Sequence, residues 1–262
     1  MPKRVRVKEY RQMLQDVQDF IDPQIHTLVR KNRPQEGASD LFGDQPPSEL
    51  LSDYALNAAG RERSVMLQQK FTDRRFNVER CWNQIQQYMP ELLTSSPQDV
   101  LEVSTGHGAM LEILRHYGHN VMGTDYAPET WSSETRDVEK PDWPYRHVVE
   151  SIDLPMMVFD NTDGQYPIES KSFDTTLCFQ ALEHSGHPDD WMETIEEFCR
   201  ISRKSVFVML GHLNPKTRAN SDYNYAFHNF RRDLRSYRDN GFVCTGTFVH
   251  WGQALGFKLT AV

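Results

Sequence analysis

The sequence predicts a doubly wound α/β fold in which a mostly parallel, seven-stranded sheet ends in an antiparallel hairpin and follows an N-terminal helical extension. Three observations support this fold class. From residue 98 onward, short apolar runs typical of strands alternate with segments of helical periodicity. The first of these runs leads into a glycine turn at Gly106 and Gly108. The chain closes on two strand patterns joined by a turn around Gly252 and Gly256, which indicates a hairpin.

The composition is that of an ordinary globular protein. Of the 262 residues, 38% are hydrophobic and 25% are charged, and the net charge is −8, which argues against a long nucleic-acid footprint. The four cysteines form no CxxC pair, so neither a zinc site nor a disulfide framework is indicated. We find no signal peptide and no apolar stretch of the ~18 residues that a membrane span needs. We therefore expect a soluble, cytoplasmic protein with no membrane partner and no metal.

Residues 1–95 are expected to form the helical extension, and residues 96–262 the domain that carries the function. Residues 1–32 have helical spacing, and their basic start is either an arm for nucleic acid or, more simply, a solvated helix start. Residues 33–49 are rich in Pro, Gly and acidic residues, which predicts a mobile linker. The helical pattern returns over 50–93, with apolar positions at Tyr54, Ala58, Phe76, Trp82, Ile85 and Tyr88.

Each element of the second domain is predicted from its own pattern. The seven strands are expected at 99–104, 120–125, 156–160, 173–180, 205–211, 243–251 and 257–262. Helices are expected at 108–118, 189–202 and 229–241, the first of them ending at Gly118. In sheets of this kind, ligands bind at the carboxyl ends of the strands, where the strand order reverses.

The glycine turn after the first strand predicts a site for a nucleotide-like cofactor. Glycine permits a positive φ and a close approach of the backbone, and the helix start presents free N–H groups. A tight turn that binds nothing is the simpler alternative. The dinucleotide fingerprint G-x-G-x-x-G/A is not met, because its third glycine falls at Leu111. A P-loop is excluded as well, since no Gly-Lys-Ser/Thr follows.

The segment Glu102-Val-Ser104-Thr-Gly106-His-Gly108 fits the pattern E-x-[G/S]-x-G-x-G. It resembles motif I of the class I S-adenosylmethionine (SAM)-dependent methyltransferases, a Rossmann-like fold family. The resemblance extends over 98–262 and includes FDTTLCFQALEH at residues 173–184, the most specific of four matching segments. Ser104 stands where the family has its first glycine. We expect serine to fit there with a negative φ and the cofactor site to be retained.

The resemblance implies a set of SAM-binding residues. They are Glu102 for the cofactor's ammonium, Ser104, Gly106 and Gly108 in the turn, Asp125 for the ribose hydroxyls, Tyr126 against adenine, the pair Asp163-Gly164 at the adenine amino group, and Phe179 and Gln180 in the fourth segment. Asp160 is an alternative for the adenine contact. No metal is needed, because methyl transfer is an in-line displacement that requires alignment and removal of an acceptor proton.

Two histidines near the predicted carboxyl edge are candidates for the catalytic base. His184 follows the fourth strand, and His212 follows the fifth. A structural role is the alternative for His184, and an exposed loop position is the alternative for His212. His184, His187 and Asp189 lack the usual spacing of metal ligands. Residues 212–230, which lie between the fifth strand and the next helix, are expected to determine acceptor specificity together with the N-terminal helices.

We therefore predict a SAM-dependent methyltransferase that acts on a hydroxyl or amine of a small metabolite, either a sugar or a biosynthetic intermediate. An RNA or protein methyltransferase that uses the basic N-terminus is one alternative. A SAM-binding protein without turnover is another. The motifs of DNA amino and C5 methylation are absent, which argues against nucleic acid as a partner. A homo-oligomer is compatible with the sequence.

Overall fold

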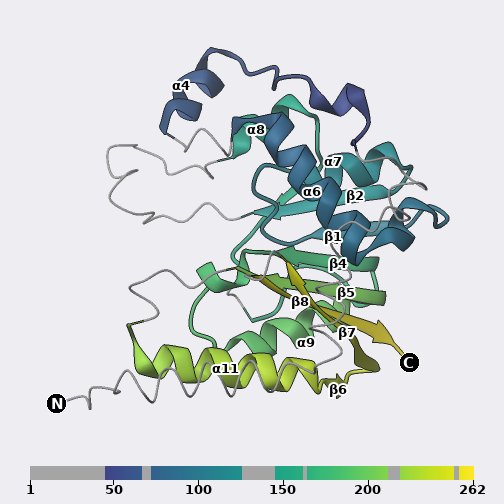
Figure 1. Cartoon of the computed structure of the whole chain (residues 1–262), viewed down its shortest axis with the longest axis vertical. Coiled ribbons are helices and arrows are strands. Elements are labelled where there is room, and N and C mark those ends of the chain that lie inside the picture. The colour runs from purple at the N-terminus through teal and green to yellow at the C-terminus, as the bar shows by residue number, and fades with distance from the viewer. Residues whose placement is uncertain (1–44, 67–71, 126–144, 162–163, 212–218, 251–253) are drawn as a thin grey trace.

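The computed structural model of the chain describes residues 45–66, 72–125, 145–161, 164–211, 219–250 and 254–262. These residues form an eight-stranded sheet in the order β3-β2-β1-β4-β5-β8-β7-β6, and Figure 1 shows the strands stacked from β2 to β7. The strands are β1 (Asp99–Glu102), β2 (Asn120–Asp125), β3 (Met156–Val158), β4 (Phe173–Phe179), β5 (Ser202–Leu210), β6 (Arg238–Asp239), β7 (Phe242–His250) and β8 (Ala254–Ala261).

The pairing of the strands confirms the predicted fold class. Strands β1 to β5 pair in parallel, and β8 lies antiparallel between β5 and β7. The seven expected strands are all present, and the two-residue strand β6 adds an eighth at the edge beside β7. Because β1 lies between β2 and β4, the strand order reverses at the carboxyl end of β1, where the glycine turn begins.

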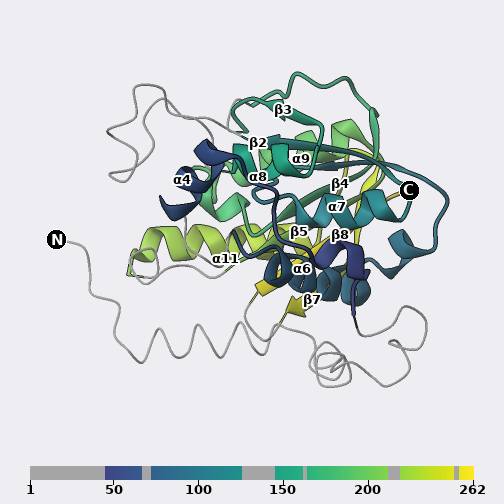
Figure 2. The same cartoon turned by 90° about the horizontal axis from the view of Figure 1, so that it is seen from above.

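Helices cover both faces of the sheet. They are α4 (Ala58–Met66), α6 (Arg74–Tyr88), α7 (Ala109–His116), α8 (Arg146–Ser151), α9 (Trp191–Ile201) and α11 (Ser221–Arg235), with short 3-10 turns η1 (Ser48–Leu51), η2 (Pro90–Leu93) and η3 (Leu182–His184). One hydrophobic core contains buried residues of α6, α7 and α8, and a second contains those of α9 and α11. Figure 2 shows α6 and α9 on opposite sides of the strands.

Helix α6 packs against the sheet domain although it belongs to the expected N-terminal extension. Its Trp82 and Ile85 are fully buried in the same core as Leu111 of α7 and Val149 of α8. Phe76 of α6 is 42% exposed, contrary to its expected apolar role, because it lies near the exposed start of the helix. Residues 1–32 and 33–44, which include most of the expected linker, lie outside the described residues.

Two helices differ from the sequence prediction. Helix α11 begins at Ser221 rather than at residue 229, because the side chain of Asn220 accepts hydrogen bonds from the N–H groups of Asp222 and Tyr223 and so caps an earlier start. Helix α8 was not predicted. Its six residues supply only two buried apolar side chains, Val148 and Val149, which is too short a pattern to show a helical period.

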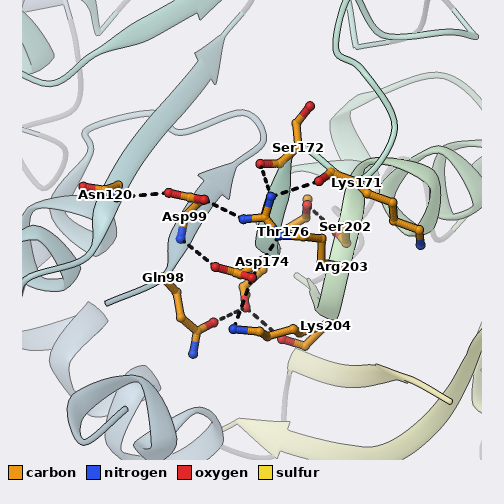
Figure 3. A network of polar contacts seen from close by, with 12 residues as sticks. Gln98, Asp99, Asn120, Lys171, Ser172, Asp174, Thr176, Ser202, Arg203 and Lys204 are labelled. Carbon is orange, nitrogen blue, oxygen red and sulfur yellow. Dashed lines mark hydrogen bonds and ion pairs between the residues drawn. The ribbon is translucent and has the colours of Figure 1, made fainter. Parts of the chain in front are cut away.

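A polar network ties the amino ends of the central strands together, opposite the edge where ligands are expected (Figure 3). Arg203 of β5 donates to Asp174 of β4 at 3.0 Å and to Asp99 of β1 at 2.5 Å. It also donates to the carbonyl oxygens of Lys171 and Ser172. These bonds to Arg203 lower the pKa of Asp174 to about 2, so the carboxylate is ionised at neutral pH. The network therefore stabilises the register of the strands that carry the site.

Candidate active site

The turn that follows β1 is held against the end of β2 by hydrogen bonds. Thr105 donates its backbone N–H to the carbonyl oxygen of Thr124 at 2.8 Å, and Thr124 returns its N–H to Thr105 Oγ1 at 3.1 Å. One residue further on, the N–H of Gly106 donates to Asp125 Oδ2 at 3.3 Å. The turn is therefore fixed at the point where the two parallel strands end.

Ser104 adopts a left-handed conformation with a φ of +56°, so the expectation of a negative φ was wrong. A non-glycine residue in this region costs about 1–2 kcal/mol. Local hydrogen bonds offset this cost: Ser104 Oγ accepts from Asn161 Nδ2 at 2.5 Å, and the Ser104 N–H donates to Thr124 Oγ1 at 3.3 Å. Asn161 is buried and also receives a hydrogen bond from Thr124 Oγ1. The serine therefore keeps the conformation that a glycine would adopt there.

The two glycines of the turn have different surroundings. Both have positive φ, +59° at Gly106 and +77° at Gly108. Among the described residues, a Cβ added to Gly106 would meet only the ring of Tyr145, at 3.8 Å, whereas one added to Gly108 would collide with Leu154 Cδ1. Gly108 is also the N-cap of α7 and has no side chain to cap the first N–H groups of that helix. In the described part of the chain, Gly106 is therefore loosely surrounded, whereas Gly108 lies in packed structure.

Two carboxylates stand at adjacent strand ends beside the turn. Glu102, the last residue of β1, is 5% exposed, and its Oε2 has no hydrogen-bond partner among the described residues. Burial raises the pKa of Glu102 to about 8, Arg80 partly opposes this shift, and Asp125 adds to it. Asp125, the last residue of β2, is half-buried and accepts the Gly106 N–H described above. The unpartnered Oε2 of this buried acid can accept a hydrogen bond from a cationic or hydrogen-donating ligand.

Burial also changes the pKa of His107, the residue between the two glycines. His107 is 7% exposed, and burial together with the nearby Arg80 lowers its pKa to about 3, so the imidazole is neutral. Arg80 comes from α6 and places Nη2 at 2.6 Å from His107 Nε2. The ring of Tyr145 packs near Gly106, and burial and the charge of Asp125 raise the pKa of its hydroxyl to about 12. The turn therefore combines groups from α6, β2 and the segment before α8.

The structure describes only part of the predicted adenine side. Phe179 ends β4 and Gln180 follows it with a φ of +53°, its N–H donating to the carbonyl oxygen of Met209. Gly164 is exposed and has no atom within 4 Å of an added Cβ. Tyr126 and Asp163 lie outside the described residues, and Asp160 is half-buried.

The candidate base His184 is the last residue of η3 and is exposed, while His212 lies outside the described residues. Gly211, the residue before His212, donates its N–H to Glu183 Oε1 at 2.6 Å. Burial raises the pKa of Glu183 to about 7, and Glu183 Oε2 has no hydrogen-bond partner among the described residues. Glu183 therefore fixes the chain immediately before His212.

The expected specificity loop is shorter than predicted. Residues 221–230 belong to helix α11, so the segment 212–230 is not one loop between strand and helix. Residues 212–218 lie outside the described part of the chain. Of the three residues tested as a metal cluster, His187 pairs with Asp189 at 3.3 Å. No group of three or more His, Cys, Asp or Glu side chains suited to a metal ion occurs among the described residues.

Sequence reasoning missed four residues of this site: Asn161, Arg80, His107 and Glu183. His107 lies between the two glycines of the turn and Glu183 lies in the segment 173–184, and these positions were the only sequence signal for them. Asn161 follows the third strand by three residues, which places it at the carboxyl edge. Arg80 gave no local signal, because its contact with His107 spans 27 positions of the sequence.

The fold is that of a doubly wound α/β protein, with a candidate binding site after its first strand. Comparison with known proteins finds one similarity in sequence: residues 101–210 match the family model described as "Methyltransferase domain". The matched segment, which is less than half of the chain, is therefore similar to methyltransferase domains. No curated protein matches the chain. None of the helices in the described ranges has the length and apolar character of a membrane span.

Solved structures resemble the fold at low sequence identity. The PH0226 protein from Pyrococcus horikoshii OT3 is 14% identical, with a TM-score of 0.52 over 75% of this chain and 93% of that one. A SAM-dependent methyltransferase from Aquifex aeolicus is 14% identical, with a TM-score of 0.44 over 66% of this chain and 87% of that one. Magnesium protoporphyrin IX methyltransferase from Synechocystis PCC 6803 with bound SAH is 15% identical, with a TM-score of 0.45 over 82% and 92%.

Proposed function

We propose that this chain transfers the methyl group of SAM to a hydroxyl or amine of a small acceptor, a sugar or a biosynthetic intermediate. The observation that carries the cofactor half of this proposal is the pair of carboxylates, Glu102 and Asp125, on either side of a left-handed turn at the point where strand order reverses. When bound, SAM supplies a sulfonium methyl that an aligned nucleophile can displace.

The residues present fit that cofactor. The orphaned Glu102 Oε2 suits an ammonium group, and Asp125 suits a pair of ribose hydroxyls, because carboxylates are strong acceptors of both. Within the described residues, only the Tyr145 ring lies near an added Cβ at Gly106, which leaves room for the methionine portion to pass the backbone closely. Gly164, Phe179, Gln180, Tyr126 and Asp163 remain proposed for the adenine side. The net charge of −8 favours a small acceptor over the alternative of RNA.

Asp125→Ala should weaken the binding of S-adenosylhomocysteine (SAH), which has the same adenosine and amino-acid portions as SAM, by about 10- to 100-fold, the worth of a charge-assisted hydrogen bond. Asp125→Asn is the matched variant, because an amide oxygen can still accept the Gly106 N–H while the negative charge is lost. Titration calorimetry measures both affinities. SAH affinity within twofold of wild type in both folded variants would remove Asp125 from the site.

For the acceptor proton, we propose His212 as the base, with His184 as the alternative. Glu183 accepts a hydrogen bond from the N–H of Gly211, so the backbone is fixed immediately before His212, after the end of β5. A positioned base near its own pKa accelerates proton transfer by about 10²–10⁴-fold. His212→Ala should therefore lower turnover ~10²-fold or more and leave SAH affinity nearly unchanged.

His184→Ala is the matched comparison for this prediction. If it abolishes turnover and His212→Ala does not, the base follows β4 instead. Loss of the limb of the pH–rate profile near the histidine pKa, in His212→Ala alone, would support the assignment. The acceptor must first be found with methyl-labelled SAM and cell-extract fractions, followed by mass spectrometry of the labelled product.

A further inference from the structure

Arg80 brings an incompletely paired guanidinium to the glycine turn. It lies in the middle of α6 and is half-buried, with Nη2 at 2.6 Å from His107 Nε2. Its Nε is buried and has no hydrogen-bond partner among the described residues. No carboxylate of the described residues lies within the 4.0 Å of an ion pair with Arg80, whereas Arg74 of the same helix is paired with Glu112.

His107 cannot accept hydrogen bonds from all the N–H donors of the Arg80 guanidinium. The N–H of Ala109 donates to His107 Nδ1 at 3.2 Å, so two donors face one imidazole. The low pKa of His107 keeps the ring neutral, and a neutral imidazole has one acceptor nitrogen and one N–H. Only one of the two contacts can therefore be a hydrogen bond. Arg80 retains donors that an anion could fill.

The ionisable groups around Arg80 are complementary to a zwitterionic ligand. Arg80 lowers the pKa of Glu102 against the effect of burial, which places its positive charge near that carboxylate. The site thus offers one buried carboxyl group, which becomes an anion on releasing its proton, and one incompletely paired cation beside the same turn. The amino-acid end of SAM carries an ammonium and a carboxylate on one carbon atom. The planar fork of arginine matches a carboxylate by two parallel hydrogen bonds.

We propose that Arg80 binds the α-carboxylate of the methionine portion of SAM while Glu102 faces its ammonium. This inference rests on the proposed cofactor site. It has a structural consequence, because Arg80 lies outside residues 101–210, the part that matches the methyltransferase family model. A residue of the N-terminal extension would then complete the cofactor site.

The test compares two ligands that differ only in that carboxylate: SAH and its decarboxylated analogue, S-adenosyl-3-thiopropylamine. Titration calorimetry on the full chain should show that the wild type prefers SAH at least tenfold. In Arg80→Met the preference should fall below threefold, with the affinity for the decarboxylated analogue changed by less than threefold. Arg80→Lys, which keeps the charge without the fork, should restore part of the preference.

Arg75→Met is the matched control on the same helix, because Arg75 is exposed and pairs with Glu79 on the surface. It should keep the wild-type preference. The proposal is overturned if the wild type does not discriminate between the two ligands, a result that needs no variant to fold. It is also overturned if folded Arg80→Met keeps the preference. Binding of neither ligand by the wild type would instead contradict the proposed function, and this inference with it.

Discussion

Glu102→Gln should make the cofactor-free protein more stable near pH 7 and at the same time weaken SAH binding by about 10- to 100-fold, since a charge-assisted contact is lost. The buried carboxylate has an unpartnered Oε2 and a pKa of about 8. In the unfolded chain the pKa of a glutamate is about 4.3. A glutamine resembles the protonated acid, which the folded protein holds without the cost of a buried charge.

The sign of this effect depends on pH. Between pH ~4 and ~8 the unfolded chain releases a proton that the folded chain retains, so the free energy of unfolding of the wild type falls as the pH rises through this window. At about 1.4 kcal/mol per pKa unit, the gain in Glu102→Gln is about 3–4 kcal/mol near pH 7 and vanishes near pH 4. Denaturant unfolding at both pH values measures it.

The same titration predicts a proton linkage in binding. Because the ammonium of SAH favours ionised Glu102, SAH should bind the wild type more tightly at pH 8 than at pH 6 and release a proton on binding at the lower pH. Calorimetry in two buffers of different ionisation enthalpy measures that proton. Equal stability of wild type and Glu102→Gln at pH 7, together with equal SAH affinity, would contradict the role of Glu102.

Gly106→Ala and Gly108→Ala should have different effects: the first should weaken SAH binding, and the second should destabilise the fold. At Gly108 the φ of +77° and the collision with Leu154 act together, and left-handed strain of about 1–2 kcal/mol plus overpacking of about 1–3 kcal/mol should destabilise the fold by ~2–5 kcal/mol. At Gly106 only the strain applies, because the added methyl makes ordinary contact with Tyr145. Gly106→Ala should therefore fold and yet bind SAH at least tenfold more weakly, since the methyl narrows the path of the cofactor.

Thermal unfolding and SAH calorimetry on both variants test this contrast. Each glycine serves as the control for the other, because both residues have positive φ and differ in their surroundings. Wild-type SAH affinity in Gly106→Ala would mean that the turn does not approach the ligand. Equal destabilisation by the two substitutions would contradict the assignment of packing to Gly108 alone.

The sequence predicted the sheet well because buried parallel strands are short apolar runs with clear ends. Strand β2 was predicted with the observed bounds, at Asn120–Asp125. The start of α11 was missed because its first turn is polar and depends on the cap at Asn220. The left-handed φ of Ser104 could not be predicted, since it depends on a hydrogen bond from Asn161, 57 positions away.

The candidate cofactor site was proposed from a local motif, whereas Arg80, which contacts the same turn, comes from a distant segment. Glu102, Gly106 and Asp125 lie in or beside the strands that the patterns identify. Arg80 reaches the turn only because α6 packs against α7 in the same core. Such tertiary contacts leave no periodic signal in the sequence, so the role proposed for Arg80 could be inferred only from the structure.

A crystal structure of the chain grown with SAH tests the central claim most directly. The account predicts a ligand beside residues 104–108, with its ribose hydroxyls on Asp125 and its amino-acid end between Glu102 and Arg80. A ligand bound elsewhere, or no ligand at millimolar SAH, would contradict it.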